Sequence, residues 1–255
     1  MQNPKPFLTP NRMEILELSA FTMTTAHILV AGGIVKKDIK NKLRSAQKIL
    51  RNLTKAGYLD FHSYLTKTGR QKYYFLSNAQ SPYHKIQPGI LTHDSITALF
   101  LTHLFRCCTK RGIQLRWYPP FSIGIKESDG GVALLKEGEP LCSLLLESDM
   151  GTHDFPEIRE KLEQYIECLS GKENRRIVFL TMEDKRKEDI QKIISNFLQK
   201  TSSLEHERKI LCLAPPQFLP DMDILSLLTG DVPDKQEVPS EGTSKNTSSG
   251  YGTSL

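Results

Sequence analysis

Two carboxylates end an apolar stretch in the segment LLLESDMGTHDFPEIREKLEQY, residues 144–165. Residues two apart on a strand share a face, so Glu147 and Asp149 are expected to point the same way. Asp129 precedes a predicted partner strand in ESDGGVALLK, and a tight turn around Gly138 would bring it near Glu147. The register stays open. One pairing places Asp129 beside Glu147, and a slip of one residue turns it to the other face.

Carboxylates that converge at a sheet end are the ligands that Mg²⁺ and Mn²⁺ prefer. A site made of Asp129, Glu147 and Asp149 would hold such an ion, which can activate water and stabilise the charge of phosphodiester cleavage. Lys161 and Tyr165 lie one turn apart on the next predicted helix, where Lys161 could pair with the carboxylates or orient a water. The alternative is an acidic strand end that is balanced by a lysine and holds no metal.

The basic residues of the chain are concentrated in one segment. Residues 36–72 contain eleven Lys and Arg but two acids, a net +9 in a chain of +5, so the remainder carries −4. A helix predicted over residues 37–56 presents a row of cations opposite its apolar face: Lys40, Arg44, Lys48, Arg51 and Lys55. Such a face is typical of a site that binds a polyanion. The alternatives are that it is a lysine-rich surface in contact with solvent, or that it binds a protein.

The elements around this helix predict a DNA-binding domain. Helices are expected over residues 9–20 and at AHILVAG, after the capping residues Thr24 and Thr25. The strands YLDFHSYL and QKYYFL flank the turn TKTGR, which carries Lys67 and Arg70 at its tip. Three helices followed by a basic hairpin predict a winged helix-turn-helix. Its third helix would enter the major groove of double-stranded DNA, and its wing would contact the flanking backbone.

The remainder of the chain predicts an α/β domain with a mixed sheet, because helix and strand signals follow in the order α-β-β-β-α-β-α-β. Strands are expected at QLRWY, FSIGIK, VALLK, LCSLLLE, RRIVFLTM and RKILCLAPP. The predicted organisation is a DNA-binding domain over 8–76, a linker over 77–91, the α/β domain over 92–228 and a disordered tail over 229–255. The fold class is therefore α/β, or α+β for the chain taken as a whole.

Composition favours a cytoplasmic protein. Hydrophobic residues make up 38% and charged residues 25% of the chain, which is ordinary for a globular protein. No apolar run approaches the roughly 18 residues of a membrane span, and the first residues carry no secretory signal. The five cysteines form no CxxC pair, so they predict buried thiols in a reducing compartment and no zinc site.

Four segments together resemble one family: LTPNRMEILEL, KILRNLTKAGYL, HDSITALFLTHL and LESDMGTHDFPEIREKLEQY. They look like the replication-relaxation family, which includes mobilisation protein C-like accessory factors of plasmids and integrative conjugative elements. The resemblance covers roughly residues 8–200. It implies an N-terminal DNA-binding domain and a C-terminal domain similar to the PD-(D/E)xK nuclease fold.

The resemblance also implies roles for the acidic residues. Asp129 would stand for the first acid of the nuclease motif, Glu147 for the second, and Lys161 for a lysine that has moved from the strand to a helix. Ser128 stands where the motif has a proline, and Asp149 where it has a lysine. Proteins of this fold have often lost cleavage and kept DNA or protein binding.

Three functions follow as expectations. The first is a DNA-binding accessory protein that acts in mobilisation or replication of an element, with a relaxase or other mobilisation protein as candidate partner. The second is an active Mg²⁺- or Mn²⁺-dependent endonuclease or nickase. The third is a winged-helix transcriptional repressor that binds its operator as a homodimer. Scission that depends on metal separates the second function from the other two.

Overall fold

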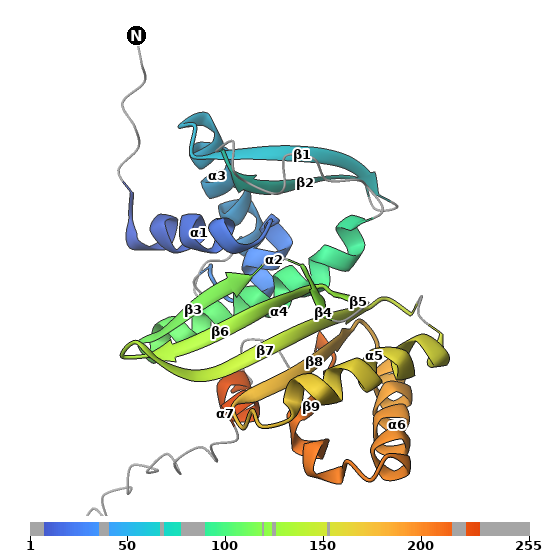
Figure 1. Cartoon of the computed structure of the whole chain (residues 1–255). Helices are drawn as coiled ribbons and strands as arrows, with labels where there is room; N and C mark the ends of the chain where they lie inside the picture. Colours follow the sequence, from blue (N-terminus) through green and yellow to red (C-terminus); the bar gives the residue numbers. More distant parts are fainter. Residues whose placement is uncertain are drawn as a thin grey trace, which may run out of the picture.

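The computed structural model describes residues 8–35, 41–66, 69–77, 90–118, 120–123, 126–151, 154–215 and 223–229. Three helices and a hairpin come first, and a long helix and a five-stranded sheet with flanking helices follow (Figure 1). The chain is thus α/β with a mixed sheet, as predicted. The predicted linker falls mostly outside the described residues, and the predicted tail almost entirely so.

The N-terminal helices are α1 (Pro10–Phe21), α2 (Ala26–Ala31) and α3 (Lys42–Lys55). Pro10 occupies the first turn of α1, where its missing N–H leaves no hydrogen bond unmade. The hydroxyl of Thr25 caps α2 by accepting from the amide of Ile28 at 3.1 Å. Gly57 follows α3 with a φ of +77°, the left-handed conformation that commonly ends a helix.

The hairpin consists of β1 (Leu59–Thr66) and β2 (Gly69–Leu76), which pair antiparallel. Its register places Phe61 opposite Tyr74, so the two rings share one face of the hairpin. Thr24 adds one further bridge, because its amide and carbonyl both bond to the backbone of Tyr74, at 2.8 and 2.7 Å. The loop before α2 is thereby tied to β2, which fixes the hairpin beside α2 and α3.

The sheet has the order β3-β6-β7-β8-β9. Its strands are β3 (Ile113–Tyr118), β6 (Gly130–Lys136), β7 (Glu139–Asp149), β8 (Arg175–Thr181) and β9 (Ile210–Leu213). β6 pairs antiparallel with both β3 and β7, whereas β7, β8 and β9 run parallel. The sheet is therefore mixed.

Helices cover the sheet on both sides. One face packs on α4 (Ile90–Lys110) and α7 (Ile224–Thr229), and the other on α5 (Phe155–Leu169) and α6 (Asp184–Lys200). A short 3₁₀ helix, Leu204–Lys209, leads into β9. Although α4 has 21 residues, none of the helices in the described part of the chain is long and apolar enough to cross a membrane.

One hydrophobic cluster joins the two halves of the chain. It runs from Leu50 and Leu53 of α3 through Phe100 and Leu104 of α4 to Leu144 of β7. Of the N-terminal helices, α2 lies next to α4, as Figure 1 shows, and all three share one core with it. The predicted domain boundary in the sequence does not interrupt this packing.

Gly32, at the end of α2, lies close against Thr102 of α4. A Cβ built at Gly32 would lie 2.3 Å from the Thr102 methyl group, although the φ of Gly32, −72°, suits any residue. We expect Gly32→Ala to lower the free energy of unfolding by about 1–3 kcal/mol, because Thr102 is buried and cannot move aside. Chemical denaturation measures this loss, and Thr102→Ser, which removes the methyl, should relieve part of it. A loss that Thr102→Ser leaves unchanged would contradict the steric explanation.

The segment FSIGIK does not form one strand of the sheet, which corrects the prediction. It contributes β4 (Phe121–Ile123) and the first residue of β5 (Lys126–Ser128), which pair only with each other. The physical reason is that Ile123 packs into the cluster between the sheet and α5–α6, so the segment folds over that face. Two further features differ from the prediction. Helix α4 begins at Ile90, within the predicted linker, and helix α7 was not predicted.

Candidate functional site

The carboxylates at the end of β7 face the layer formed by α5 and α6. Leu145 packs into the cluster on that side, whereas Leu144 and Leu146 pack with α4, as the alternation along a strand predicts. Glu147 and Asp149 are each 2% exposed. Two carboxylates buried this completely require partners inside the protein.

Both carboxylate oxygens of Glu147 are occupied. Lys161 Nζ donates to Oε2 and forms a salt bridge, and the Tyr165 hydroxyl donates to Oε1. The two donors are four residues apart on α5, so one face of the helix presents both. The predicted pairing of Lys161 with this carboxylate is confirmed.

Asp129 lies beside Glu147. The β6–β7 register pairs Gly130 with Leu146, so the next position places Asp129 opposite Glu147. Of the two registers that the sequence left open, this is the one that brings the acids together. Asp129 Oδ2 accepts from the amide of Ser148 at 2.6 Å, which holds the side chain against β7.

Burial, more than any neighbour, sets the proton affinity of Glu147. The pKa of Glu147 is raised to about 7, mainly by burial and also by the charge of Asp129, while Lys161 and Tyr165 oppose the rise. Burial and the adjacent Glu147 both raise the pKa of Tyr165, so its hydroxyl keeps its proton and stays a donor. The cluster is therefore a buried acid that changes charge near neutral pH.

Asp149 belongs to a different interaction. Its Oδ2 accepts from Arg186 Nε at 3.2 Å and Nη2 at 2.8 Å, and its Oδ1 from the amide of Gly151 at 2.6 Å. Arg186 lies in the first turn of α6, and nothing in the sequence pointed to it. Asp149 thus joins β7 to α6, while Glu147 joins β7 to α5.

These residues do not fit a divalent metal. No group of three metal-ligating side chains placed to hold an ion occurs among the described residues. An ion at Glu147 would have to displace Lys161 and Tyr165 from a side chain that solvent hardly reaches. We therefore assign no chemical step to a metal here. Glu147 and Lys161 form a buried ion pair instead, and this pair holds α5 on the sheet.

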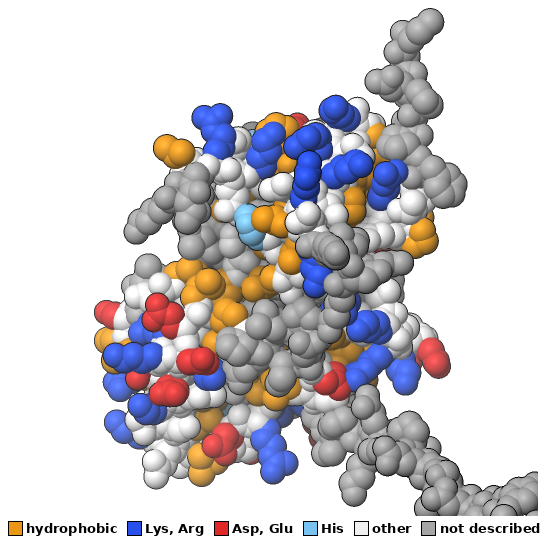
Figure 2. Space-filling view, turned by 180° about the vertical axis from the view of Figure 1, so that it is seen from behind, with side chains coloured by type: hydrophobic (Ala, Val, Ile, Leu, Met, Phe, Trp, Pro, Cys, Tyr) orange, Lys and Arg blue, Asp and Glu red, His pale blue; other side chains and the backbone are white. Residues whose placement is uncertain are grey.

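The basic row predicted on the third helix lies on the surface. Arg44, Lys48, Arg51 and Lys55 are exposed, whereas Ala46, Leu50 and Leu53 of α3 are buried. Leu43, which was expected on the apolar face, is 37% exposed. Arg70 of the hairpin is exposed as well. Lys40 and Lys67, also predicted to bind DNA, lie outside the described residues. Figure 2 shows Lys and Arg gathered over the N-terminal half, whereas acids and cations mix over the other half.

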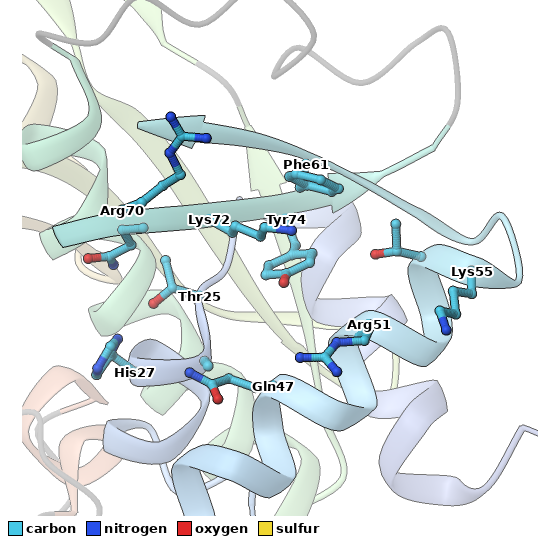
Figure 3. A pocket seen from close by; sticks show the side chains of 12 residues that line it. Thr25, His27, Gln47, Arg51, Lys55, Phe61, Arg70, Lys72 and Tyr74 are labelled. Carbon is cyan, nitrogen blue, oxygen red and sulfur yellow. The ribbon is translucent and has the colours of Figure 1, made fainter. Parts of the chain in front are cut away.

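A pocket of about 480 Å³ lies between α2, α3 and the hairpin, and we call it the α3–hairpin pocket. Four cations contribute to its lining: Arg51, Lys55, Arg70 and Lys72. Two aromatic rings, Phe61 and Tyr74, line it as well, and in Figure 3 they lie on the hairpin across from Arg51. None of its lining residues is acidic.

The cations and rings of the pocket are close enough to influence one another. Lys72 Nζ lies 3.9 Å from the centre of the Phe61 ring, a cation–π contact. Burial raises the pKa of Tyr74, and the nearby charge of Arg51 opposes that rise. The ring centres of Phe61 and Tyr74 are 5.8 Å apart. The pocket therefore combines positive charge with aromatic surface.

The sequence predicted the cations of α3 but not the pocket beside them. The alternation along β2 places Arg70, Lys72 and Tyr74 on one face, and this pattern could have identified that wall. The other wall depends on how α2 packs against α3, which no local pattern encodes. His27 and Gln47 line the pocket for this reason alone.

Comparisons with known proteins do not extend this description: no protein-family model, no curated protein and no solved structure matches the chain.

Proposed function

We propose that this chain is a DNA-binding accessory protein of a plasmid or integrative element, acting in its mobilisation or replication. Its N-terminal half would bind duplex DNA as a winged helix-turn-helix. Its second half would be a nuclease-like domain that does not cleave DNA. The observation that carries DNA binding is the exposed row Arg44, Lys48 and Arg51 on a helix that contains no acid. The assignment to a mobile element, and to a relaxase as partner, rests on the family resemblance.

The spacing of the row suits a helix that lies along DNA. Steps of four and three residues place Arg44, Lys48 and Arg51 on one side of α3, opposite the buried Leu50 and Leu53. A helix that enters the major groove presents such a side to base edges and to the phosphates at the groove's margin. The hairpin lies beside α3, where the wing of a winged helix would contact flanking backbone.

The proposal for the second half rests on topology and on the state of the acids. The order α4, three antiparallel strands, α5 and a parallel strand supports this proposal, because it is the order that the resemblance leads us to expect. Asp129 and Glu147 lie side by side, as the first two acids of that fold would. Since both oxygens of Glu147 are held inside the protein, however, a role without cleavage fits these residues better than catalysis.

Duplex binding by the purified chain tests the proposal, measured by fluorescence anisotropy over a range of salt concentrations. The variant Arg44→Ala/Lys48→Ala is expected to weaken binding roughly tenfold at low salt. It should also reduce the slope of log K against log salt by about 2, because two phosphate contacts are lost. The matched control is Lys185→Ala/Lys200→Ala, which removes two exposed lysines from α6 and should change neither quantity.

Two results would overturn the proposal. Affinity and salt slope that stay the same in Arg44→Ala/Lys48→Ala would remove α3 as the DNA-binding helix. Supercoiled plasmid that is nicked with Mg²⁺ or Mn²⁺, but not with EDTA or by Glu147→Gln, would make the acidic cluster catalytic. That second result would replace the accessory role by a metal-dependent nuclease.

A further inference from the structure

We propose that the α3–hairpin pocket binds one unpaired nucleotide, with its phosphate on the cations and its base against Phe61. This inference rests on the proposed DNA-binding function and deepens it. Arg44 and Lys48 would lie on duplex DNA, while the pocket, which includes Arg51 at the end of the same row, would take a nucleotide that has left the duplex. The ligand is defined by its chemistry, a phosphate joined to an aromatic base.

The size of the pocket limits what can enter it. Its volume of about 480 Å³ lies within the roughly 300–1,000 Å³ that is typical of small-ligand sites. A DNA duplex is far wider than this space, whose walls are the short helix α2, one face of α3 and one face of the hairpin. A single nucleotide, free or within an unpaired strand, is a ligand of suitable size.

The charge of the pocket selects an anion. Arg51 and Lys55 contribute from α3, and Arg70 and Lys72 from β2, so cations lie on two of its walls. No carboxylate lines the pocket to neutralise them. Arginine and lysine from opposite sides can hold a phosphate between them, which a solvated row on one helix cannot do.

The aromatic rings distinguish a nucleotide from a simple anion. Phe61 is half-buried, so part of its ring faces the pocket, and Lys72 Nζ lies over that ring at 3.9 Å. A base that stacks on Phe61 would displace the ammonium group from the ring and leave it for the adjacent phosphate. Grooves that pair cations with stacking aromatic rings are the general means of binding single strands without sequence preference.

Polar side chains complete the lining. Gln47 projects from α3, and its amide can donate to and accept from the edge of a base. Figure 3 shows Gln47 and His27 at the end of the pocket away from Lys55. The pocket therefore offers stacking, charge and hydrogen bonding from three elements.

Binding of a short labelled oligothymidylate, followed by anisotropy, tests the pocket. The whole chain should bind it, and Phe61→Leu should weaken binding roughly five- to tenfold, because stacking is lost while an apolar side chain remains. Lys72→Gln should weaken it too, and since Lys72 is exposed this variant also serves if Phe61→Leu does not fold. The matched control is Tyr64→Leu, an aromatic residue of the same strand outside the pocket, which should bind as the wild type does.

Competition identifies the source of the nucleotide. Thymidine monophosphate that displaces the oligomer indicates a site that accepts a free nucleotide. Displacement by unlabelled oligomer alone indicates a site for a strand, and both outcomes support the proposal. Inorganic phosphate that competes as well as the monophosphate would reduce the pocket to an anion site and overturn the assignment of a base.

The failure of this inference differs from failure of the proposed function. Duplex that binds through Arg44 and Lys48, beside oligothymidylate that does not bind or that binds Phe61→Leu and wild type equally, would overturn the pocket alone. Loss of all duplex binding would overturn the proposed function instead.

Discussion

Lys161→Met is expected to lower the free energy of unfolding by about 3 kcal/mol at pH 8, and by far less at pH 5. Lys161 forms the salt bridge to Glu147, and their side chains are 14% and 3% exposed. Removing one partner of a buried pair leaves an uncompensated charge, which typically costs 3–5 kcal/mol. The lower end applies because Glu147 can escape by taking up a proton. At pH 5 the carboxyl is already protonated, so little charge remains to be stranded.

Urea denaturation of Lys161→Met at pH 5 and pH 8 measures both values. The control Lys185→Met removes an exposed lysine and should leave stability unchanged at either pH. The double variant Lys161→Met/Glu147→Gln should lose less than the sum of the single losses, because neither member of the pair is left charged without its partner. A loss of equal size at pH 5 and pH 8 would instead indicate that Lys161 acts through packing.

Glu147→Gln is expected to remove a fall in stability between about pH 4.5 and pH 7. The folded protein holds the proton of Glu147 up to a pKa of about 7, against a usual value of 4.5. Between these values the folded state binds more protons than the unfolded state, so stability decreases as the pH rises. The full contribution is roughly 3 kcal/mol, present below pH 4.5 and lost as the pH passes 7.

The measurement is the difference in unfolding free energy between wild type and Glu147→Gln at each pH. Using the difference cancels the titration of the other carboxylates. Glu163→Gln removes an exposed acid of the same helix and provides the control, for which the difference should stay constant. A wild type whose stability, relative to Glu147→Gln, rises between pH 4.5 and 7 would show that Lys161 outweighs burial.

The local spacing of apolar residues was sufficient to predict most helices and strands of this chain. α3 was predicted because its apolar residues recur every three or four positions and Gly57 follows its end. α5 was predicted in the same way, and the spacing of Lys161 and Tyr165 along it led to one of the two partners of Glu147. Such features depend on residues near in sequence, where helical and strand periods are informative.

Contacts between residues that are distant in sequence could not be predicted from such patterns. FSIGIK alternates like a strand, but the burial of Ile123 against α5–α6 decides its course. Arg186 meets Asp149 across 37 residues, and no period relates the two. The register beside Asp129 needed the structure as well, because shifting a strand by one residue reverses its faces without changing its sequence.

The hydrophobic cluster that joins α3, α4 and β7 has a consequence for dissecting this protein. A fragment that ends at residue 76 would expose the surface of α2 that packs on α4, around Gly32. The complementary fragment would expose Phe100 and Leu104. Because such fragments would expose apolar surface, they would be prone to aggregate, and a loss of binding could not be assigned to the missing half. The two halves are better separated by single substitutions in the intact chain, one surface at a time.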